Sequence, residues 1–501
     1  MIEIVEHKSS IQINLNESIG KVNPFVLGQF IEHFPRQIYG GIYEEGSPYS
    51  DSNGFRLDVE KALKDLDPPI LRWPGGNYTS GYHWKWGAGP KNERVDRKNP
   101  VWDESESHRF GTTEFIEHCR RIGAEPSICV GVGCSDKNPT PEEAAAWVRY
   151  CNAADGPEAE LRAKAGYPEP LNVKWWGLGN EVWGPWQIGY YPKGEDYGKD
   201  ALKFIKAMRK SDASLKFIAV GADPGFPTLT WNKQLLSNDD FVREIDALNW
   251  HHYLQVGDPD IRITHREALL GLRKVERKLR RLIKNIQNAC ERIGRDDLIP
   301  IAITEWNEYG WIHSPWTTDV NDKNKAPEQY DLAHALYTAG FLNIILRKAA
   351  NISMANYSPM VNTRGIIYAD DRGVLLRSTY FVFQMYKPCA GGSSLLIQVD
   401  CPELEDSKAL VLDVAAVKAV ENGVYIFVVN RALEDLACQI TIPDFAVKSS
   451  SGTILTAESL KSYNSFENPD TVIPRPFEVN LSGEVFKISF PKHSLSVLLL
   501  E

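Results

Sequence analysis

Residues 175–181 read Trp-Trp-Gly-Leu-Gly-Asn-Glu, and residues 301–307 read Ile-Ala-Ile-Thr-Glu-Trp-Asn. Each stretch is typical of a buried apolar strand that ends in a carboxylate among polar and aromatic residues. An ionised carboxylate is costly to bury, so neither Glu181 nor Glu305 strengthens an apolar core. The two stretches therefore predict a pair of carboxylates that face one pocket from the ends of two strands.

Similar apolar stretches recur between residues 24 and 389 and alternate with helical segments. The eight expected strands are Phe25–Ile31, Ile70–Trp73, Ser127–Val132, Val173–Leu178, Phe217–Gly221, Ala247–His251, Ile299–Thr304 and Ile352–Asn356. The expected helices include Asp58–Leu66, Thr113–Ile122, Pro141–Cys151, Tyr197–Ser211, Arg266–Ile293, Tyr330–Arg347 and Ser378–Tyr386. The strands are continuous apolar runs, as in a sheet that is covered on both faces. Eight such repeats predict an α/β fold in which residues 21–388 close into a (β/α)8 TIM barrel.

The pattern changes after residue 388. Short β-branched segments follow one another with turns between them, and no helical periodicity intervenes. This pattern predicts an all-β sandwich of jelly-roll type over residues 389–501. Residues 1–20 also read as strand, and we expect them to join the sheet of that second domain.

Composition narrows the classes of function. The net charge of −10 argues against a nucleic-acid partner, which would require clustered Lys and Arg. We find no apolar run long enough to span a bilayer and no signal-peptide core, so we expect no membrane partner and a cytoplasmic location. The eight cysteines form no Cys-x-x-Cys pair, which favours reduced structural thiols over disulfides or zinc ligands.

Polar residues gather where six of the expected strands end, which in this barrel type is the active-site rim. They are Glu32 after the first strand, Arg72 and Asn77 after the second, Asn180 and Glu181 after the fourth, His251 and Tyr253 at the sixth, Glu305 at the seventh and Asn356 at the eighth. A single polar strand end is compatible with a structural salt bridge. Six of them on one rim indicate a catalytic pocket.

Glu181 and Glu305 are the predicted catalytic pair, because the fourth and seventh strands lie across the mouth of the barrel. Hydrolysis of a glycoside through a covalent glycosyl-enzyme needs a carboxylate nucleophile and a carboxylic acid about 5–5.5 Å apart. One must be ionised and the other protonated near neutral pH. Their surroundings must therefore push the two pKa values apart.

Other rim residues suit supporting roles. Arg72 would keep one carboxylate ionised, Asn180 would bind a substrate hydroxyl, and Tyr253 would hydrogen-bond the nucleophile. His251 is either a sugar contact and tuner of the acid/base, or a structural histidine. A His–Glu metal site is a rival interpretation, but no His-Glu-x-x-His or His-x-His spacing is present, so we expect neither a metal nor a cofactor.

Five segments carry a resemblance to a known family. Residues 40–44, 72–77, 178–181, 184–189 and 305–307 read Gly-Gly-Ile-Tyr-Glu, Arg-Trp-Pro-Gly-Gly-Asn, Leu-Gly-Asn-Glu, Gly-Pro-Trp-Gln-Ile-Gly and Glu-Trp-Asn. In order and spacing they are similar to the signature segments of glycoside hydrolase family 51, the α-L-arabinofuranosidases. The resemblance extends over the whole chain, and the Gly-Pro-Trp-Gln-Ile-Gly segment is the most specific of the five.

The resemblance implies a retaining exo-glycosidase that releases terminal α-L-arabinofuranosyl residues from arabinan, arabinoxylan or their oligosaccharides. It implies Glu181 as the general acid/base and Glu305 as the nucleophile, without a metal in the chemistry. It further implies furanose-binding residues (Glu32, Asn77 and Asn180) and residues that support the nucleophile (Arg72 and Tyr253). Members are often hexamers, so a hexameric or trimeric homo-oligomer is expected.

The sequence departs from the family pattern at two places that bear on which sugar the site prefers. Val182-Trp183 follows the acid/base where the family commonly has Met-Asp, and Trp183 is expected near the cleft. Pro359 stands where the family often has a glutamine beside the sugar. Two alternatives stay open: a glycosidase of this scaffold that acts on a β-glucan, a xylan or another furanose, and a non-catalytic carbohydrate-binding protein. Retention of both glutamates argues against the second.

Overall fold

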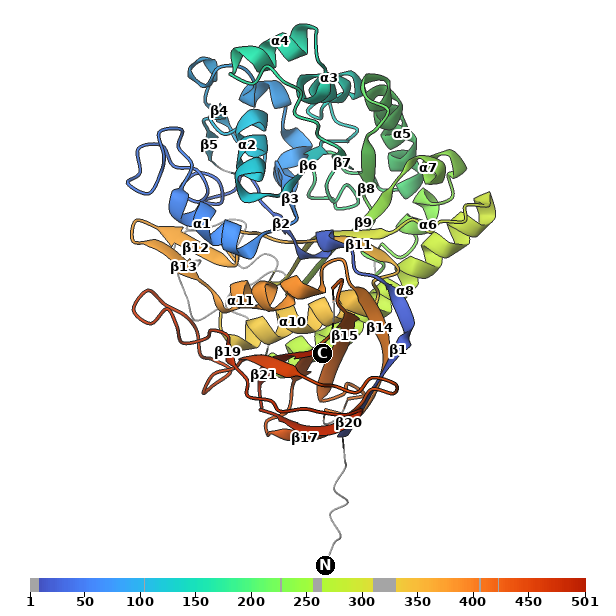
Figure 1. Cartoon of the computed structure of the whole chain (residues 1–501). Coiled ribbons are helices and arrows are strands. Elements are labelled where there is room, and N and C mark those ends of the chain that lie inside the picture. Colours follow the sequence, from blue (N-terminus) through green and yellow to red (C-terminus); the bar gives the residue numbers. More distant parts are fainter. Residues whose placement is uncertain are drawn as a thin grey trace, which may run out of the picture.

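The computed structural model describes residues 9–102, 104–225, 228–255, 264–309, 330–404, 407–421 and 423–501. Figure 1 shows a barrel domain above a second, all-β layer, with both joined along one broad interface. This arrangement confirms the predicted fold class.

The barrel is closed by eight parallel strands in the order β10-β11-β2-β3-β6-β7-β8-β9. Their bounds are β2 Gly28–Phe30, β3 Ile70–Trp73, β6 Glu125–Val130, β7 Trp175–Leu178, β8 Lys216–Ala219, β9 Ala247–Gln255, β10 Ile301–Tyr309 and β11 Ile352–Tyr357. The first strand is shorter than predicted because a 3-10 helix, Pro24–Leu27, precedes it and is capped by Asn23. Strands β9 and β10 run further than predicted, since their polar ends stay paired in the sheet.

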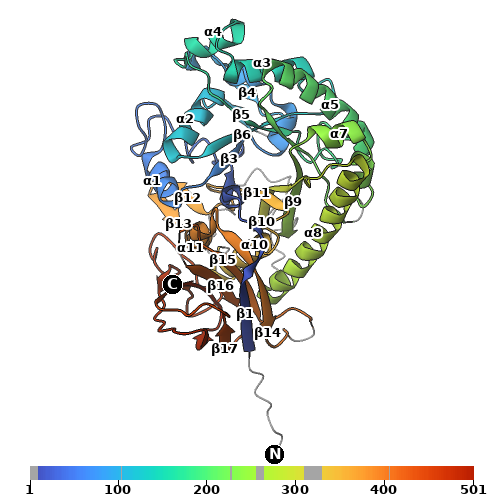
Figure 2. The same ribbon diagram turned by 45° about the vertical axis from the view of Figure 1, so that its right-hand side comes forward.

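Helices cover the outside of the barrel. Their bounds are α1 Leu57–Leu66, α2 Thr112–Ile122, α3 Pro141–Asn152, α4 Pro157–Lys164, α5 Gly194–Ser211, α6 Trp231–Leu235, α7 Asp239–Glu244, α8 His265–Ile293, α10 Leu332–Leu346 and α11 Ser378–Tyr386. The long α8 runs down one side of the barrel to the all-β layer (Figure 2). It starts at a capping box formed by Thr264 and Glu267. Every residue of α10 except Ala333 is buried, because this helix is sandwiched between the barrel and the second domain.

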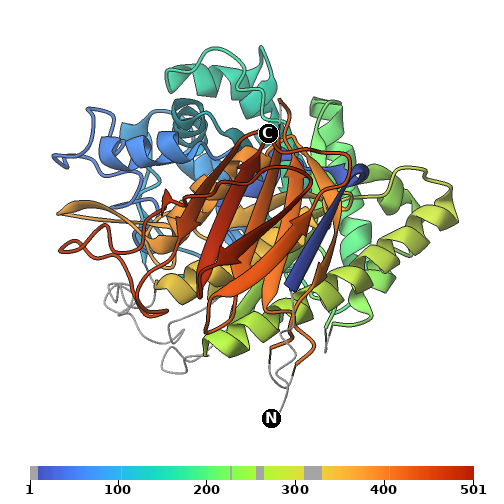
Figure 3. The same cartoon turned by 60° about the horizontal axis from the view of Figure 1, so that its bottom comes forward.

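The second domain is a nine-stranded, sandwich-like sheet with the order β19-β18-β21-β16-β15-β14-β1-β17-β20 (Figure 3). Its strands are β1 Ser9–Lys21, β14 Ser393–Asp400, β15 Leu412–Lys418, β16 Val424–Asn430, β17 Leu436–Thr441, β18 Ser450–Leu455, β19 Arg475–Pro476, β20 Val485–Phe490 and β21 Ser494–Leu500. The N-terminal β1 pairs with β14 on one side and β17 on the other. Apolar side chains such as Ile13, Ile426 and Phe490 form the core of this domain.

Two short hairpins lie outside both sheets and were not expected from the sequence. They are β4 Arg97–Lys98 with β5 Ser105–Glu106, and β12 Ile367–Asp370 with β13 Gly373–Leu376. All eight cysteines are free thiols, and seven are buried. None of the helices within the described ranges has the length and apolarity required to cross a membrane.

A buried charge cluster ties the two domains together. Asp413 of β15 accepts hydrogen bonds from Arg347, just after α10, and from Asn343 within α10, at 2.5 and 3.2 Å. It also forms an ion pair with Arg431, which is buried beside it. Burial and the neighbouring charge of Arg347 lower the pKa of Arg431 to about 9. Asp413 therefore supplies the negative charge that offsets the repulsion between the guanidinium groups of Arg347 and Arg431.

We predict that Asp413→Asn destabilises the protein by about 3 kcal/mol, because it leaves the buried Arg431 without its counter-charge. Urea denaturation followed by tryptophan fluorescence measures the loss. The matched control is Asp470→Asn, a change of the same kind at an exposed loop position. Equal unfolding midpoints for the two variants would contradict the role given to Asp413.

Candidate active site

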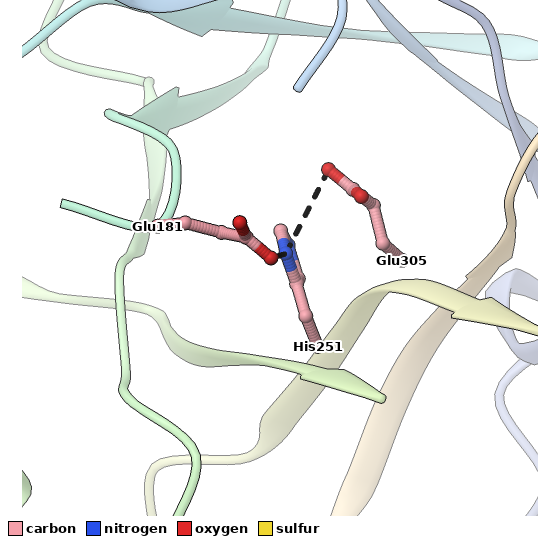
Figure 4. A group of neighbouring side chains, drawn as sticks. All are labelled: Glu181, His251 and Glu305. Atoms are coloured by element: carbon pink, nitrogen blue, oxygen red, sulfur yellow. Dashed lines mark hydrogen bonds and ion pairs between the residues drawn. The ribbon is translucent and has the colours of Figure 1, made fainter. Parts of the chain in front are cut away.

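Two carboxylates and an imidazole meet at one place: Glu181 from the segment after β7, His251 from within β9 and Glu305 from within β10 (Figure 4). Glu305 lies within β10 and pairs in register with His251 of β9. Glu181 follows β7 with a φ of +43°, in the left-handed region that a non-glycine residue rarely adopts. One carboxylate oxygen of Glu181, one of Glu305 and a ring nitrogen of His251 all lie within 4.8 Å of one another.

Glu305 is held as an anion. Arg72 donates from Nη1 to its Oε1 at 2.6 Å, and the Tyr253 hydroxyl donates to Oε2 at 2.6 Å. Burial by itself would raise the pKa of Glu305. The charges of His251 and Arg72, together with the hydrogen bonds from Tyr253 and Arg72, outweigh burial and lower it below the ordinary value. This carboxylate is therefore ionised over the neutral range and available as a nucleophile.

Glu181 has different neighbours. Its Oε1 lies 3.0 Å from Nδ1 of His251, and its Oε2 accepts a hydrogen bond of 3.2 Å from the indole of Trp186. Neither neighbour is an arginine, and Trp186 is 57% exposed, so this carboxylate sits at the open side of the pocket. It is accessible for exchanging protons with a substrate or water.

A chain of hydrogen bonds orients His251. The Thr304 hydroxyl lies 2.9 Å from Nε2 of His251 and accepts a 2.6 Å hydrogen bond from the Asn249 amide. Nδ1 of His251 faces Glu181, so a proton on this nitrogen is donated to that carboxylate. The structure thus brings His251 against Glu181 and Glu305, and its role as a sugar contact and acid/base tuner stays a prediction.

Glu32 is a third carboxyl group in the pocket. It is buried, and its Oε1 accepts from the backbone amide of Tyr78 at 3.0 Å and from the indole of Trp102 at 3.4 Å. Burial, followed by the negative charge of Glu305, raises the pKa of Glu32 to about 7. It therefore has both a donor and an acceptor form near neutral pH, which suits contact with sugar hydroxyls.

The amides predicted to bind substrate form a connected group. Asn180 accepts from Arg72 Nη2 at 2.8 Å and donates to Asn77 at 3.4 Å. Asn77 is also bound by Gln187, which in turn accepts from Ser80 at 2.9 Å. Both asparagines are consequently fixed in orientation near Glu305.

Two further predicted residues lie at the margins of this group. Trp183 is half-buried and packs edge-to-face on Trp186, with 5.3 Å between ring centroids. Asn356 is buried, and its amide donates to the carbonyl of Gln29 at 3.0 Å, bridging β11 and β2. This hydrogen bond is to the barrel backbone, so substrate binding by Asn356 stays a prediction.

Several contributing residues were not selected from the sequence. They are Trp186, Gln187, Asn249, Thr304, Ser358 and Arg364. Trp186 and Gln187 belong to the quoted Gly-Pro-Trp-Gln-Ile-Gly segment, so that motif was an available signal. The other four lie within strands or loops whose local sequence is unremarkable.

The geometry of Glu181, His251 and Glu305 would also accommodate a metal ion. However, Arg72 already neutralises Glu305 at 2.6 Å, and a metal would place a second cation beside that guanidinium. Like charges at such a distance repel strongly in a buried site. The donor set therefore fits proton transfer and nucleophilic attack better than metal binding.

Comparisons with known proteins identify relatives over nearly the full length. The family model "Alpha-L-arabinofuranosidase 1 domain" matches residues 62–262, and "Alpha-L-arabinofuranosidase C-terminal domain" matches residues 305–494. A probable α-L-arabinofuranosidase C of Aspergillus fumigatus is 33% identical, covering 98% of this chain and 96% of that protein. An intracellular exo-α-L-arabinofuranosidase of Bacteroides ovatus is 30% identical, covering 99% and 96%.

A solved structure is similar throughout. The α-L-arabinofuranosidase from Thermotoga maritima, in complex with arabinose, superposes with a TM-score of 0.86 at 32% identity. The match covers 98% of this chain and 99% of that one. The resemblance therefore includes both the barrel and the all-β domain.

We predict that Glu32 makes stability depend on pH. Because its pKa is about 7 in the folded protein and near 4.5 in the unfolded chain, the folded state binds the extra proton. The contribution of Glu32 to stability is therefore fully present below pH 4.5 and is lost as pH rises through 7, by about 3 kcal/mol. Glu32→Gln cannot lose that proton, so its stability relative to wild type should rise by this amount between pH 4.5 and 8.

Urea denaturation at a series of pH values measures the difference. Glu484→Gln, at an exposed position, is the control and should follow the wild-type pH profile. A Glu32→Gln profile parallel to wild type would contradict the raised pKa.

Proposed function

The chain belongs to the α-L-arabinofuranosidases of glycoside hydrolase family 51, and on this premise we propose that Glu181 and Glu305 carry out its retaining hydrolysis. The protein is a glycoside hydrolase that releases terminal α-L-arabinofuranosyl residues. Glu305 acts as the nucleophile and Glu181 as the general acid/base.

One observation carries these assignments. Oxygen atoms of the two carboxylates lie within 4.8 Å of each other. Inverting pairs are about 6.5–9.5 Å apart, whereas retaining pairs are about 5–5.5 Å apart. The unequal surroundings of the two groups support the division of roles, since the ionised Glu305 is bound by Arg72 and Tyr253.

In the first step Glu305 attacks the anomeric carbon while protonated Glu181 gives its proton to the glycosidic oxygen. The bond between the anomeric carbon and that oxygen breaks, and the leaving group departs as an alcohol. An ester between the sugar and Glu305 remains. Arg72 and Tyr253 stabilise the carboxylate before attack and again when the ester is released.

In the second step Glu181, now a carboxylate, takes a proton from water. The water oxygen attacks the anomeric carbon, the ester bond breaks, and Glu305 returns to its ionised form. Two inversions at one carbon give net retention of configuration. His251, with its proton on Nδ1, stabilises Glu181 in its charged form between the steps.

We assign the remaining predicted residues to substrate contacts. Glu32, Asn77 and Asn180 would bind the furanose hydroxyls from the buried side of the pocket. Trp183 and the exposed Trp186 lie on the side of Glu181, the residue that protonates the leaving group. These two indoles therefore suit the sugar that follows the cleaved bond, whose apolar face packs well on aromatic rings.

Three broader assignments follow from the family relationship. We propose that the natural substrates are arabinofuranosyl oligosaccharides or polysaccharides of hemicellulose. The name of the Bacteroides ovatus relative supports a cytoplasmic location. A homo-oligomer, hexameric or trimeric, rests on the resemblance to the family.

We expect Glu305→Ala to reduce kcat on p-nitrophenyl α-L-arabinofuranoside by on the order of 10⁴- to 10⁶-fold, since it removes the nucleophile. Glu181→Ala should lose about 10²- to 10⁴-fold on substrates with poor leaving groups, and much less on p-nitrophenyl glycosides in the first step. Added azide should restore turnover of Glu181→Ala by attacking the ester without a general base. A wild type without activity, or Glu305→Ala with full activity, would overturn the assignment.

Tyr253→Phe tests the support given to the nucleophile. The hydrogen bond from Tyr253 lowers the pKa of Glu305, so its removal raises that pKa. Because attack requires ionised Glu305, the acidic limb of the pH profile of kcat/KM should move to higher pH. We also expect kcat/KM at the optimum to fall roughly tenfold or more. Tyr425→Phe, in the distant β16, should leave the profile unchanged, and an unmoved limb in Tyr253→Phe would refute the link.

A further inference from the structure

Arg364 is a buried arginine whose side chain donates no hydrogen bond within the described part of the chain. It is 9% exposed, and its Nε is buried without a hydrogen-bond partner. Of the six buried arginines in the described part of the chain, the other five donate to protein oxygen atoms; they are Arg56, Arg72, Arg162, Arg377 and Arg431. Unsatisfied buried donors are expensive, so such an exception calls for a ligand or a function.

The guanidinium group lies beside the proposed catalytic residues. Its Cζ is 5.3 Å from the centroid of the Tyr253 ring, and Tyr253 holds the nucleophile Glu305. The charge of Arg364 also acts on the carboxyl group of Glu32. Arg364 is thus close both to the residue that attacks the sugar and to one that is assigned to its hydroxyls.

The backbone on both sides of Arg364 is held rigidly. Buried Arg377 donates to the carbonyls of Thr363 and Gly365, each at 2.8 Å. The carbonyl of Arg364 itself accepts from the Asn307 amide at 3.1 Å. Thr363 has a φ of +41°, a strained conformation that this clamp maintains. The backbone position of Arg364 in the loop after β11 is therefore fixed, and with it the origin of the side chain.

We propose that Arg364 is a specificity-determining residue that donates hydrogen bonds to hydroxyl oxygens of the sugar bound against Glu305. This inference rests on the proposed function and names a further contact of the same site. Pro359, in the same loop, has no side-chain donor, whereas Arg364 carries a guanidinium group. The guanidinium presents up to five N–H groups in fixed directions, which suits adjacent oxygen atoms.

A neutral sugar fits this site better than an acidic one. Glu32 already contributes a carboxyl group within electrostatic range of Arg364, and Glu305 and Glu181 add two more to the pocket. A substrate carboxylate would join three such groups, of which Arg72 compensates only Glu305. Hydroxyl oxygens accept from a guanidinium without adding charge. The ligand class is accordingly a neutral furanoside.

The test combines Arg364→Met with monodeoxy p-nitrophenyl α-L-arabinofuranosides that lack the 2-, 3- or 5-hydroxyl. On the parent glycoside, Arg364→Met should lower kcat/KM by roughly 10- to 100-fold, the effect of a hydrogen bond to a charged donor. On the deoxy substrate that lacks the partner hydroxyl, wild type and variant should differ by no more than about twofold. Such coupling reports direct contact, which a role through Tyr253 alone would not produce.

The control is Arg372→Met, which removes an exposed arginine eight residues further along that is bound to Asp370. It should change kcat/KM by less than about twofold on every substrate. Arg364→Gln replaces Arg364→Met if the latter does not fold, with the same expectation. An equal loss on all four substrates would overturn the proposal for Arg364. An inactive wild type would instead contradict the proposed function.

Discussion

The ion pair between Arg72 and Glu305 is the interaction on which the catalytic site depends. Both side chains are buried, and either charge alone would be costly to keep there. Arg72 also binds Asn180, so one guanidinium joins β3, β10 and the segment after β7. The closed barrel brings these three elements to one rim, and the pair in turn holds the nucleophile ionised and the amide oriented.

Three glutamate carboxyl groups lie together in the site, and each has different neighbours. Glu305 faces a guanidinium and a phenol, so its pKa is lowered. Glu32 is equally buried but has only neutral donors within hydrogen-bonding distance, and its pKa rises to about 7. Glu181 lies at the open side beside His251 and an exposed indole. Environment rather than residue type therefore separates nucleophile, sugar ligand and acid/base.

Much of the fold was predictable because it depends on patterns that repeat along the chain. Continuous apolar runs marked the eight strands, and three-to-four periodicity marked the helices between them. The errors have local causes: Pro24 shortens the first strand, and pairing between polar residues extends β9 and β10 beyond their apolar portions. Four site residues could be predicted from the sequence because they stand at or just after the ends of apolar runs; they are Glu181, Glu305, Arg72 and Tyr253. Asn249 and Arg364 could not be predicted, since nothing in their flanking residues distinguishes them from structural positions. Thr304, which directly precedes Glu305, was read as the last residue of the apolar strand.

The sequence by itself determined which functional groups lie on the rim, because the local sequence fixes both where a strand ends and which residues stand there. It also carried the family segments that assign Glu181 and Glu305 their roles. Only the tertiary structure decided how those groups behave. The 2.6 Å contact of Glu305 joins residues 233 positions apart in the chain, and its second contact, with Tyr253, spans 52 positions. Such neighbours decide the ionisation of Glu305, the position of the proton on the His251 ring and the missing hydrogen bond of Arg364 Nε. Electrostatic energies in a buried site are set by distance in space and not by order in the chain.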